Sequence, residues 1–186
     1  MKIAFPARLV AACVVAVTCF ASQCFASSDY LLEIDDIVGD SKTGGVDIIA
    51  YSHDVKSPRD AASGQATGRA ASGGGGGTGK VSMSDISFST RMGKASPQLM
   101  QACATGKHFT KATLTCRKSG GGTTQTYLKI TMSDCLVSSF ASTGNSADDA
   151  PVETFSLNFT KIEFEFIDSS GQSTKVSWDL AKGTRA

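Results

Sequence analysis

The chain has 186 residues, of which 41% are hydrophobic and 19% are charged, and its formal net charge is +1 at pH 7. These values are typical of one globular domain and exclude an intrinsically disordered chain. They also argue against a nucleic-acid-binding or membrane-surface protein, because both classes depend on clusters of Lys and Arg.

The first 26 residues differ in kind from the rest of the chain. Lys2 and Arg8 precede an uncharged run, Leu9–Ala21, and then a short stretch that ends at Ala26. This order is typical of a secretory signal, and the run is shorter than the roughly 20 apolar residues that span a bilayer. We therefore expect cleavage after Ala26, export to the periplasm or beyond, and a single domain over residues 27–186 with no stable membrane insertion.

Cleavage would change both the charge and the cysteine count. It would remove Lys2 and Arg8, two of the 18 basic residues, and none of the 17 acidic ones, leaving a net charge of −1. Three cysteines would remain: Cys103, Cys116 and Cys135. An oxidising compartment permits one disulfide among three, but apolar positions such as these also suit free thiols, so the disulfide state stays open. No CxxC pair indicates zinc.

Two strands are predicted at the start of the domain. Apolar residues alternate with others in Tyr30–Asp35 and again in the β-branched segment Val46–His53, with the turn-rich Asp36–Gly45 between them. From Val55 to Gly79 the chain becomes rich in Ala, Gly and Ser, which predicts an extended flexible loop.

Glycines at the end of this loop match a phosphate-binding pattern, GxxxxGK, at Gly74–Lys80. Such a loop needs an apolar strand before it, Ser or Thr after its Lys, and a helix beyond. Position 81 is Val, no apolar run precedes the glycines, and Val81–Thr90 alternates as a strand does. We interpret the stretch as a hinge into that strand and predict no nucleotide or other cofactor.

The segment Ser96–Gly106 has a helical period. Ser96 is a candidate N-cap, Pro97 suits the first turn, and Gly106 can adopt the left-handed closing conformation. The predicted apolar face consists of Leu99, Met100 and Cys103.

A hairpin follows, because Phe109–Lys118 and Gln125–Val137 flank a glycine-rich turn. The register that gathers its apolar residues on one side pairs Cys116 with Leu128, Leu114 with Ile130, and Ala112 with Met132.

In the last strands the apolar residues change from odd-numbered to even-numbered positions, which is a change of parity. Apolar residues alternate through Phe155–Phe159, and the alternation shifts at Lys161 so that Ile162 begins the next set. This predicts a bulge or a strand that leaves one sheet for another. A final strand, Lys175–Leu180, carries Val176, Trp178 and Leu180 on one face. About eight strands with one helix predict a closed or nearly closed antiparallel β-barrel.

Two patterns suggest chemistry, and each has a simpler structural explanation. Cys103 and His108 are a possible nucleophile and base, but Cys103 lies on the apolar helix face and a cationic His108 would favour the helix C-terminus. The acidic pairs lie in turns or alternate with core residues, as solvated acids do; they are Asp35–Asp36, Asp148–Asp149 and Glu163 with Glu165. We predict no catalytic residue, no metal site and no enzyme.

Several short motifs occur in a characteristic order. They are Asp29–Ile34, Gly73–Gly77 with Gly79–Val81, Asp85–Phe88, Lys94–Pro97, Ala102–His108, Tyr127–Thr131, Leu136–Ser139 and Leu157–Phe159. This set resembles the haemolysin-coregulated protein (Hcp) family, the tube proteins of the bacterial type VI secretion system, over essentially all of residues 29–180.

The resemblance implies a two-sheet β-barrel with one flanking helix, which forms hexameric rings that stack into a hollow tube and hold small effector proteins. It implies lumen or effector contacts for Tyr51, Ser52, His53, Gln98 and Gln101. It brings Val55–Gly79 toward the neighbouring ring, with Arg59, Arg69, Gly73, Gly77 and Lys80 as candidate contacts. The implied partners are further copies of the chain, small effectors, and spike and sheath components.

The predicted signal segment supports a second hypothesis, because tube subunits of this family assemble in the cytoplasm and carry no signal peptide. The alternative is an exported binding module that has the same fold and is not part of the tube. A secreted enzyme or toxin is the third hypothesis, and Cys103 with His108 is its candidate pair for thiol catalysis.

Overall fold

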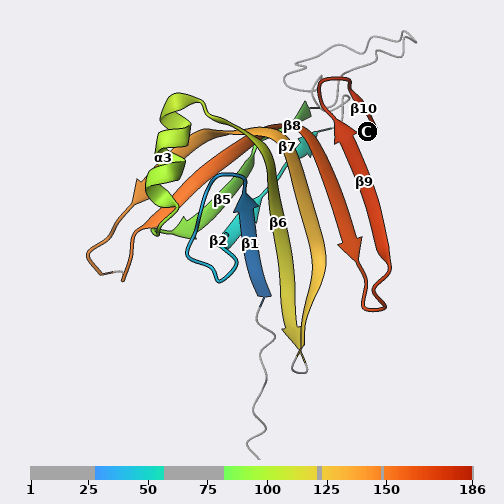
Figure 1. Ribbon diagram of the computed structural model, residues 1–186, viewed down its shortest axis with the longest axis horizontal. Coiled ribbons are helices and arrows are strands. Elements are labelled where there is room, and N and C mark those ends of the chain that lie inside the picture. The colour runs from blue at the N-terminus through green and yellow to red at the C-terminus, as the bar shows by residue number, and fades with distance from the viewer. Residues whose placement is uncertain (1–27, 57–81, 121–122, 148, 186) are drawn as a thin grey trace, which may run out of the picture.

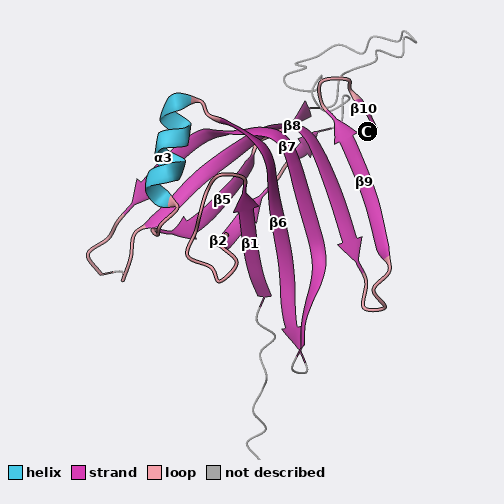
Figure 2. Cartoon of the chain, viewed as in Figure 1, coloured by secondary structure: helices cyan, strands magenta, loops and turns pink. Residues whose placement is uncertain are grey.

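The computed structural model describes residues 28–56, 82–120, 123–147 and 149–185. Figure 2 shows that this part of the chain is mostly strand and contains one helix. The elements are β1 (Ser28–Ile34), β2 (Val46–Ser52), β3 (Val55–Lys56), β4 (Ser82–Met83), β5 (Ile86–Arg91), α3 (Ser96–Thr105), β6 (His108–Gly120), β7 (Thr123–Thr143), β8 (Val152–Ile167), β9 (Ser173–Asp179) and β10 (Thr184–Arg185). The mainly β fold class is therefore confirmed.

Six strands close into a barrel. Their hydrogen-bonded order is β8-β5-β2-β1-β6-β7, and β7 pairs back with β8. Strands β9 and β10 extend the sheet outward from β8, while β3 and β4 form a separate two-stranded ribbon. In Figure 1, α3 lies on one side of the barrel and β9 lies on the opposite side. The fold is the antiparallel barrel with one flanking helix that the sequence predicts.

Strand β8 closes the barrel because it changes partners along its length. Val152–Leu157 pairs with β5 and Lys161–Ile167 pairs with β9, while the other edge of β8 pairs with β7. At the change, the Thr160 hydroxyl donates to Oδ2 of Asp134 at 2.8 Å, and Asp134 has a positive φ of 49°. The predicted parity change is confirmed as an exchange of partner strands.

The β6–β7 hairpin has the predicted register. Ala112 pairs with Met132, Leu114 with Ile130, and Cys116 with Leu128. All of these side chains are fully buried except Leu128, which is partly buried. The core continues into the facing strands, where the rings of Phe88 and Phe155 stack with centroids 5.4 Å apart.

The predicted strand Val81–Thr90 is wrong as a continuous element. β4 ends at Met83 and β5 begins at Ile86, because Ser84 bonds to Asp54 instead of to a neighbouring strand. The Ser84 N–H donates to the Asp54 carbonyl at 3.0 Å, and Ser84 Oγ accepts the Asp54 N–H at 3.2 Å. Val81 itself lies outside the described residues.

The helix ends as predicted, but it starts differently. Gly106 closes it with a φ of 62°. Ala95, not Ser96, is the N-cap residue, so the cap prediction for Ser96 is wrong. The Ser96 hydroxyl instead accepts the Gly93 N–H at 2.9 Å and donates to the buried Glu153 Oε2 at 2.6 Å.

The buried face of α3 also differs from the predicted one. Leu99 and Ala102 are buried and Cys103 is partly buried, whereas Met100 is 56% exposed. The helix packs against β7, and the position of that strand decides which helical residues are covered. Met100 therefore lies outside the buried face.

Candidate assembly surfaces

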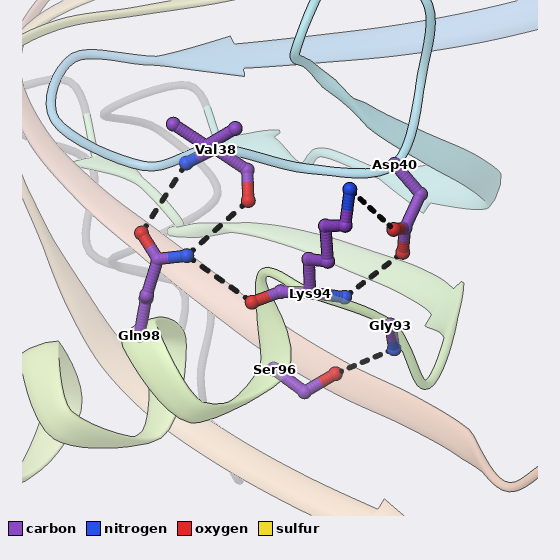
Figure 3. A network of polar contacts seen from close by, with 6 residues as sticks. All are labelled: Val38, Asp40, Gly93, Lys94, Ser96 and Gln98. Carbon is purple, nitrogen blue, oxygen red and sulfur yellow. Dashed lines mark hydrogen bonds and ion pairs between the residues drawn. The ribbon is translucent and has the colours of Figure 1, made fainter.

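The loop between β1 and β2 is docked onto α3 by one side chain, that of Gln98 (Figure 3). Gln98 Oε1 accepts the Val38 N–H at 3.3 Å, and its Nε2 donates to the carbonyls of Val38 at 3.2 Å and Lys94 at 3.1 Å. A primary amide is both donor and acceptor, so Gln98 satisfies both backbone groups of Val38. Gln98 therefore holds this loop on the helix.

Asp40 fixes the turn that precedes the helix. Its Oδ2 accepts the Lys94 N–H at 2.8 Å, and its Oδ1 lies 4.0 Å from the Lys94 ammonium (Figure 3). A Cβ at position 93 would overlap the Asp40 carboxylate, so this approach requires Gly93. The loop, the turn and the first helical turn are thereby held together.

A pocket of about 280 Å³ lies between this turn, β2 and α3. Its apolar lining residues are Val46, Ile48, Ile49, Met92, Ala95 and Leu99. We call it the helix-side pocket. Leu99 and Ala95 are buried, while Ile49 and Met92 are 49% and 48% exposed. The pocket therefore combines a buried apolar floor with an exposed apolar rim. Its lining comes from two stretches that are far apart in the sequence, residues 39–49 and 90–99, which is why no sequence pattern indicated it.

The predicted contact residues at the end of β2 are partly packed into aromatic clusters. Tyr51 is half-buried, and its ring meets that of Tyr30 edge-on, with centroids 5.7 Å apart at 84°. Burial, with a smaller effect from neighbouring Cys116, raises the pKa of Tyr51 to about 12. Tyr51 is therefore a neutral packing residue with one accessible side.

His53 has an unusual environment for a histidine. Its ring stacks on Phe164 with centroids 5.6 Å apart and lies 6.0 Å from the ring of Phe159. Nε2 is buried and has no hydrogen-bond partner among the described residues. Burial lowers the pKa of His53 below its ordinary value of 6.5, partly opposed by Asp54, so the neutral ring is favoured.

The five predicted lumen residues form two groups in the structure. Gln98 and Gln101 lie on α3, whereas Tyr51, Ser52 and His53 lie at or just beyond the end of β2. Gln101 and Ser52 are exposed, and the other three are partly buried. The candidate inter-ring residues all lie outside the described residues; they are Arg59, Arg69, Gly73, Gly77 and Lys80.

The three cysteines of the domain are unpaired in this structure. Cys116 and Cys135 are buried and Cys103 is partly buried. Burial raises the pKa of the Cys116 thiol and raises that of Cys135 to about 11. Because the thiolate is the reactive form, these two buried thiols are poor nucleophiles.

His108, Glu163 and Glu165 each have a polar partner. His108 Nδ1 lies 3.1 Å from Oδ1 of Asp134, and Glu163 and Glu165 lie 3.7 Å and 3.2 Å from the Lys175 ammonium. Across the described ranges, no three His, Cys, Asp or Glu side chains gather as metal ligands would. No helix in the same ranges has the length and apolar character to cross a membrane.

A second apolar surface lies on the β8–β9 ribbon, which we define as Lys161–Ile167 paired with Ser173–Asp179. Phe166 pairs with Thr174, and Phe164 with Val176. Phe166 and Val176 are each 55% exposed. The alternation that begins at Ile162 predicts which residues share a face and not whether a further element covers that face, so the exposure of Phe166 could not be predicted from the sequence.

A closed β-barrel with exposed apolar surfaces on opposite sides is the kind of subunit that assembles with copies of itself. Residues 31–166 match the family described as "Type VI secretion system effector, Hcp". Protein hcp1 of Pseudomonas aeruginosa is 34% identical over 113 residues, which are 58% of this chain and 70% of that protein.

Solved structures agree with this match. Hcp1 from Salmonella typhimurium is 25% identical with a TM-score of 0.69, and the likeness covers 86% of this chain and 99% of that one. A type VI secretion system effector from Yersinia pestis shares the fold at 22% identity with a TM-score of 0.64, over 81% of this chain and 99% of that one.

The chain belongs to the Hcp family, and it is a subunit of the type VI secretion tube. The resemblance drawn from the short motifs is confirmed. Members of this family are structural, secreted proteins that assemble with further copies of themselves.

Proposed function

We propose that the chain forms hexameric rings, that the rings stack with contacts from Val55–Gly79, and that the bore holds effector proteins. The observation that carries the proposal is the family match over residues 31–166. The two apolar surfaces support it, because a ring of identical subunits joins two different surfaces at each interface. Spike and sheath components would be partners of the finished tube.

The proposal assigns effector contact to the predicted lumen residues in two ways. Ser52 and Gln101 are exposed, so they are the side chains that would touch an effector directly. Tyr51, His53 and Gln98 are partly buried and would shape the surface around them. No catalytic step is part of this function.

Electron microscopy of residues 27–186 at high protein concentration tests the ring. We expect annular particles with sixfold symmetry, some of them stacked. Isolated compact particles at every concentration would favour the alternative, an exported binding module of the same fold.

The predicted signal segment is what supports that alternative, and we propose that residues 1–26 direct export. N-terminal sequencing of protein from the periplasm and the cytoplasm tests this directly. Cleavage after Ala26 predicts periplasmic protein that begins at Ser27. A pool that begins at Met1 in the cytoplasm, with none in the periplasm, contradicts export.

A further inference from the structure

We propose that Phe166 of one subunit inserts into the helix-side pocket of the next subunit, and that this contact closes the ring. The inference rests on the proposed ring, and it specifies which two surfaces of neighbouring subunits are in contact. It assigns the interface to the β8–β9 ribbon on one side of the barrel and to the turn before α3 on the other.

Phe166 has the properties of an interface anchor. It is the only aromatic residue among the large exposed hydrophobic residues of the described chain. Its backbone is held on both sides, by Leu128 of β7 and by Thr174 of β9, so little conformational freedom remains to be lost on binding. Val176, equally exposed, lies diagonally across the same face. Rigid aromatic anchors surrounded by smaller contacts are typical of interface hot spots.

The helix-side pocket suits such an anchor in size and chemistry. Its volume is about 280 Å³, and an apolar cavity of about 150 Å³ is enough for a benzene ring. Ile49 and Met92 at its rim are the exposed apolar side chains that a phenyl ring would cover. Arg91 also lines the pocket, and a guanidinium next to an aromatic ring adds a favourable contact.

The positions of the two surfaces fit a ring. In Figure 1 the β8–β9 ribbon and α3 lie on opposite sides of the barrel. An anchor and a pocket on opposite sides cannot meet within one subunit, and they join subunits head to tail. Repetition of one head-to-tail contact produces a closed ring or a filament, whereas a two-fold dimer would need a surface that matches itself.

Cross-linking between the two surfaces tests the contact. The variant combines Thr174→Cys, next to Phe166 on the paired strand, with Met92→Cys in a Cys103→Ser background, so that Phe166 is kept while Cys116 and Cys135 stay buried. With a short bis-maleimide reagent we expect a ladder of covalent oligomers that reaches the full ring, and no ladder from either single-cysteine variant. Rings of normal mass without a ladder would overturn this interface and leave the proposed function intact. A wild-type chain that forms no ring would overturn both.

A charge substitution gives an independent test with a matched control. Phe166→Glu should raise the protein concentration needed for half-assembly by roughly tenfold or more. Met100→Glu changes a residue of the same exposure, 56% against 55%, that does not line the pocket. It should leave that concentration within about twofold. Thermal unfolding of the monomers checks that both variants fold. If Phe166→Glu and Met100→Glu changed the concentration needed for half-assembly equally, the inference would be overturned.

Discussion

His53 packs against two phenylalanine rings just beyond the end of β2. A protonated imidazole is disfavoured there, because burial removes water and Nε2 has no acceptor among the described residues. The unfolded chain has no such restriction. Folding stability contributed by His53 is therefore greatest above the ordinary pKa of 6.5 and decreases as the pH falls toward the lower pKa of the folded state.

The substitution His53→Phe should remove this pH dependence while it keeps an aromatic ring packed against Phe159 and Phe164. We expect the denaturant midpoint of the wild type to fall more than that of the variant between about pH 7.5 and about pH 5. Chemical denaturation of residues 27–186, at concentrations where both are in the same assembly state, measures the difference. Identical decreases for the two proteins would show that His53 is protonated freely in the folded state.

At the level of secondary structure, α3 is attached to the barrel through a buried hydrogen bond. Ser96 Oγ donates to Glu153 Oε2 at 2.6 Å, and both side chains are buried. Ser96→Ala would leave this carboxyl group without its hydroxyl donor, which should lower the free energy of unfolding by about 2 kcal/mol. Thr105→Ala is the control, because Thr105 is exposed and bonds only within its own helix at 2.8 Å. The control should cost less than about 0.5 kcal/mol. A Ser96→Ala effect no larger than that of Thr105→Ala would contradict this role.

The elements also show how far the sequence could be used to predict the structure. The β6–β7 register was predictable because it alone puts six apolar residues on one buried face. The break at Ser84 was not, since it depends on hydrogen bonds to Asp54, 30 positions away. The exposure of Met100 and Phe166 depends on which elements pack over α3 and over the β8–β9 ribbon, and the local pattern encodes neither arrangement.

At the level of the whole molecule, the candidate sites were less predictable from the sequence than the family and the fold. The short motifs were sufficient to identify the family, and alternation was sufficient to predict a barrel. The helix-side pocket and the exposed face of the β8–β9 ribbon were not visible in the sequence, because the pocket forms only when α3 lies beside β2 and β5, and the ribbon forms only when β8 exchanges β5 for β9. These are the surfaces on which the proposed assembly depends.

The central claim is that copies of this chain assemble into rings, and the mass in solution of a protein comprising residues 27–186 tests it most directly. Size-exclusion chromatography with light scattering on residues 27–186 should give a particle of six subunits. Its mass should fall toward that of one subunit when Phe166 is changed to Glu. A wild-type protein that remains a single subunit at high concentration would contradict the account.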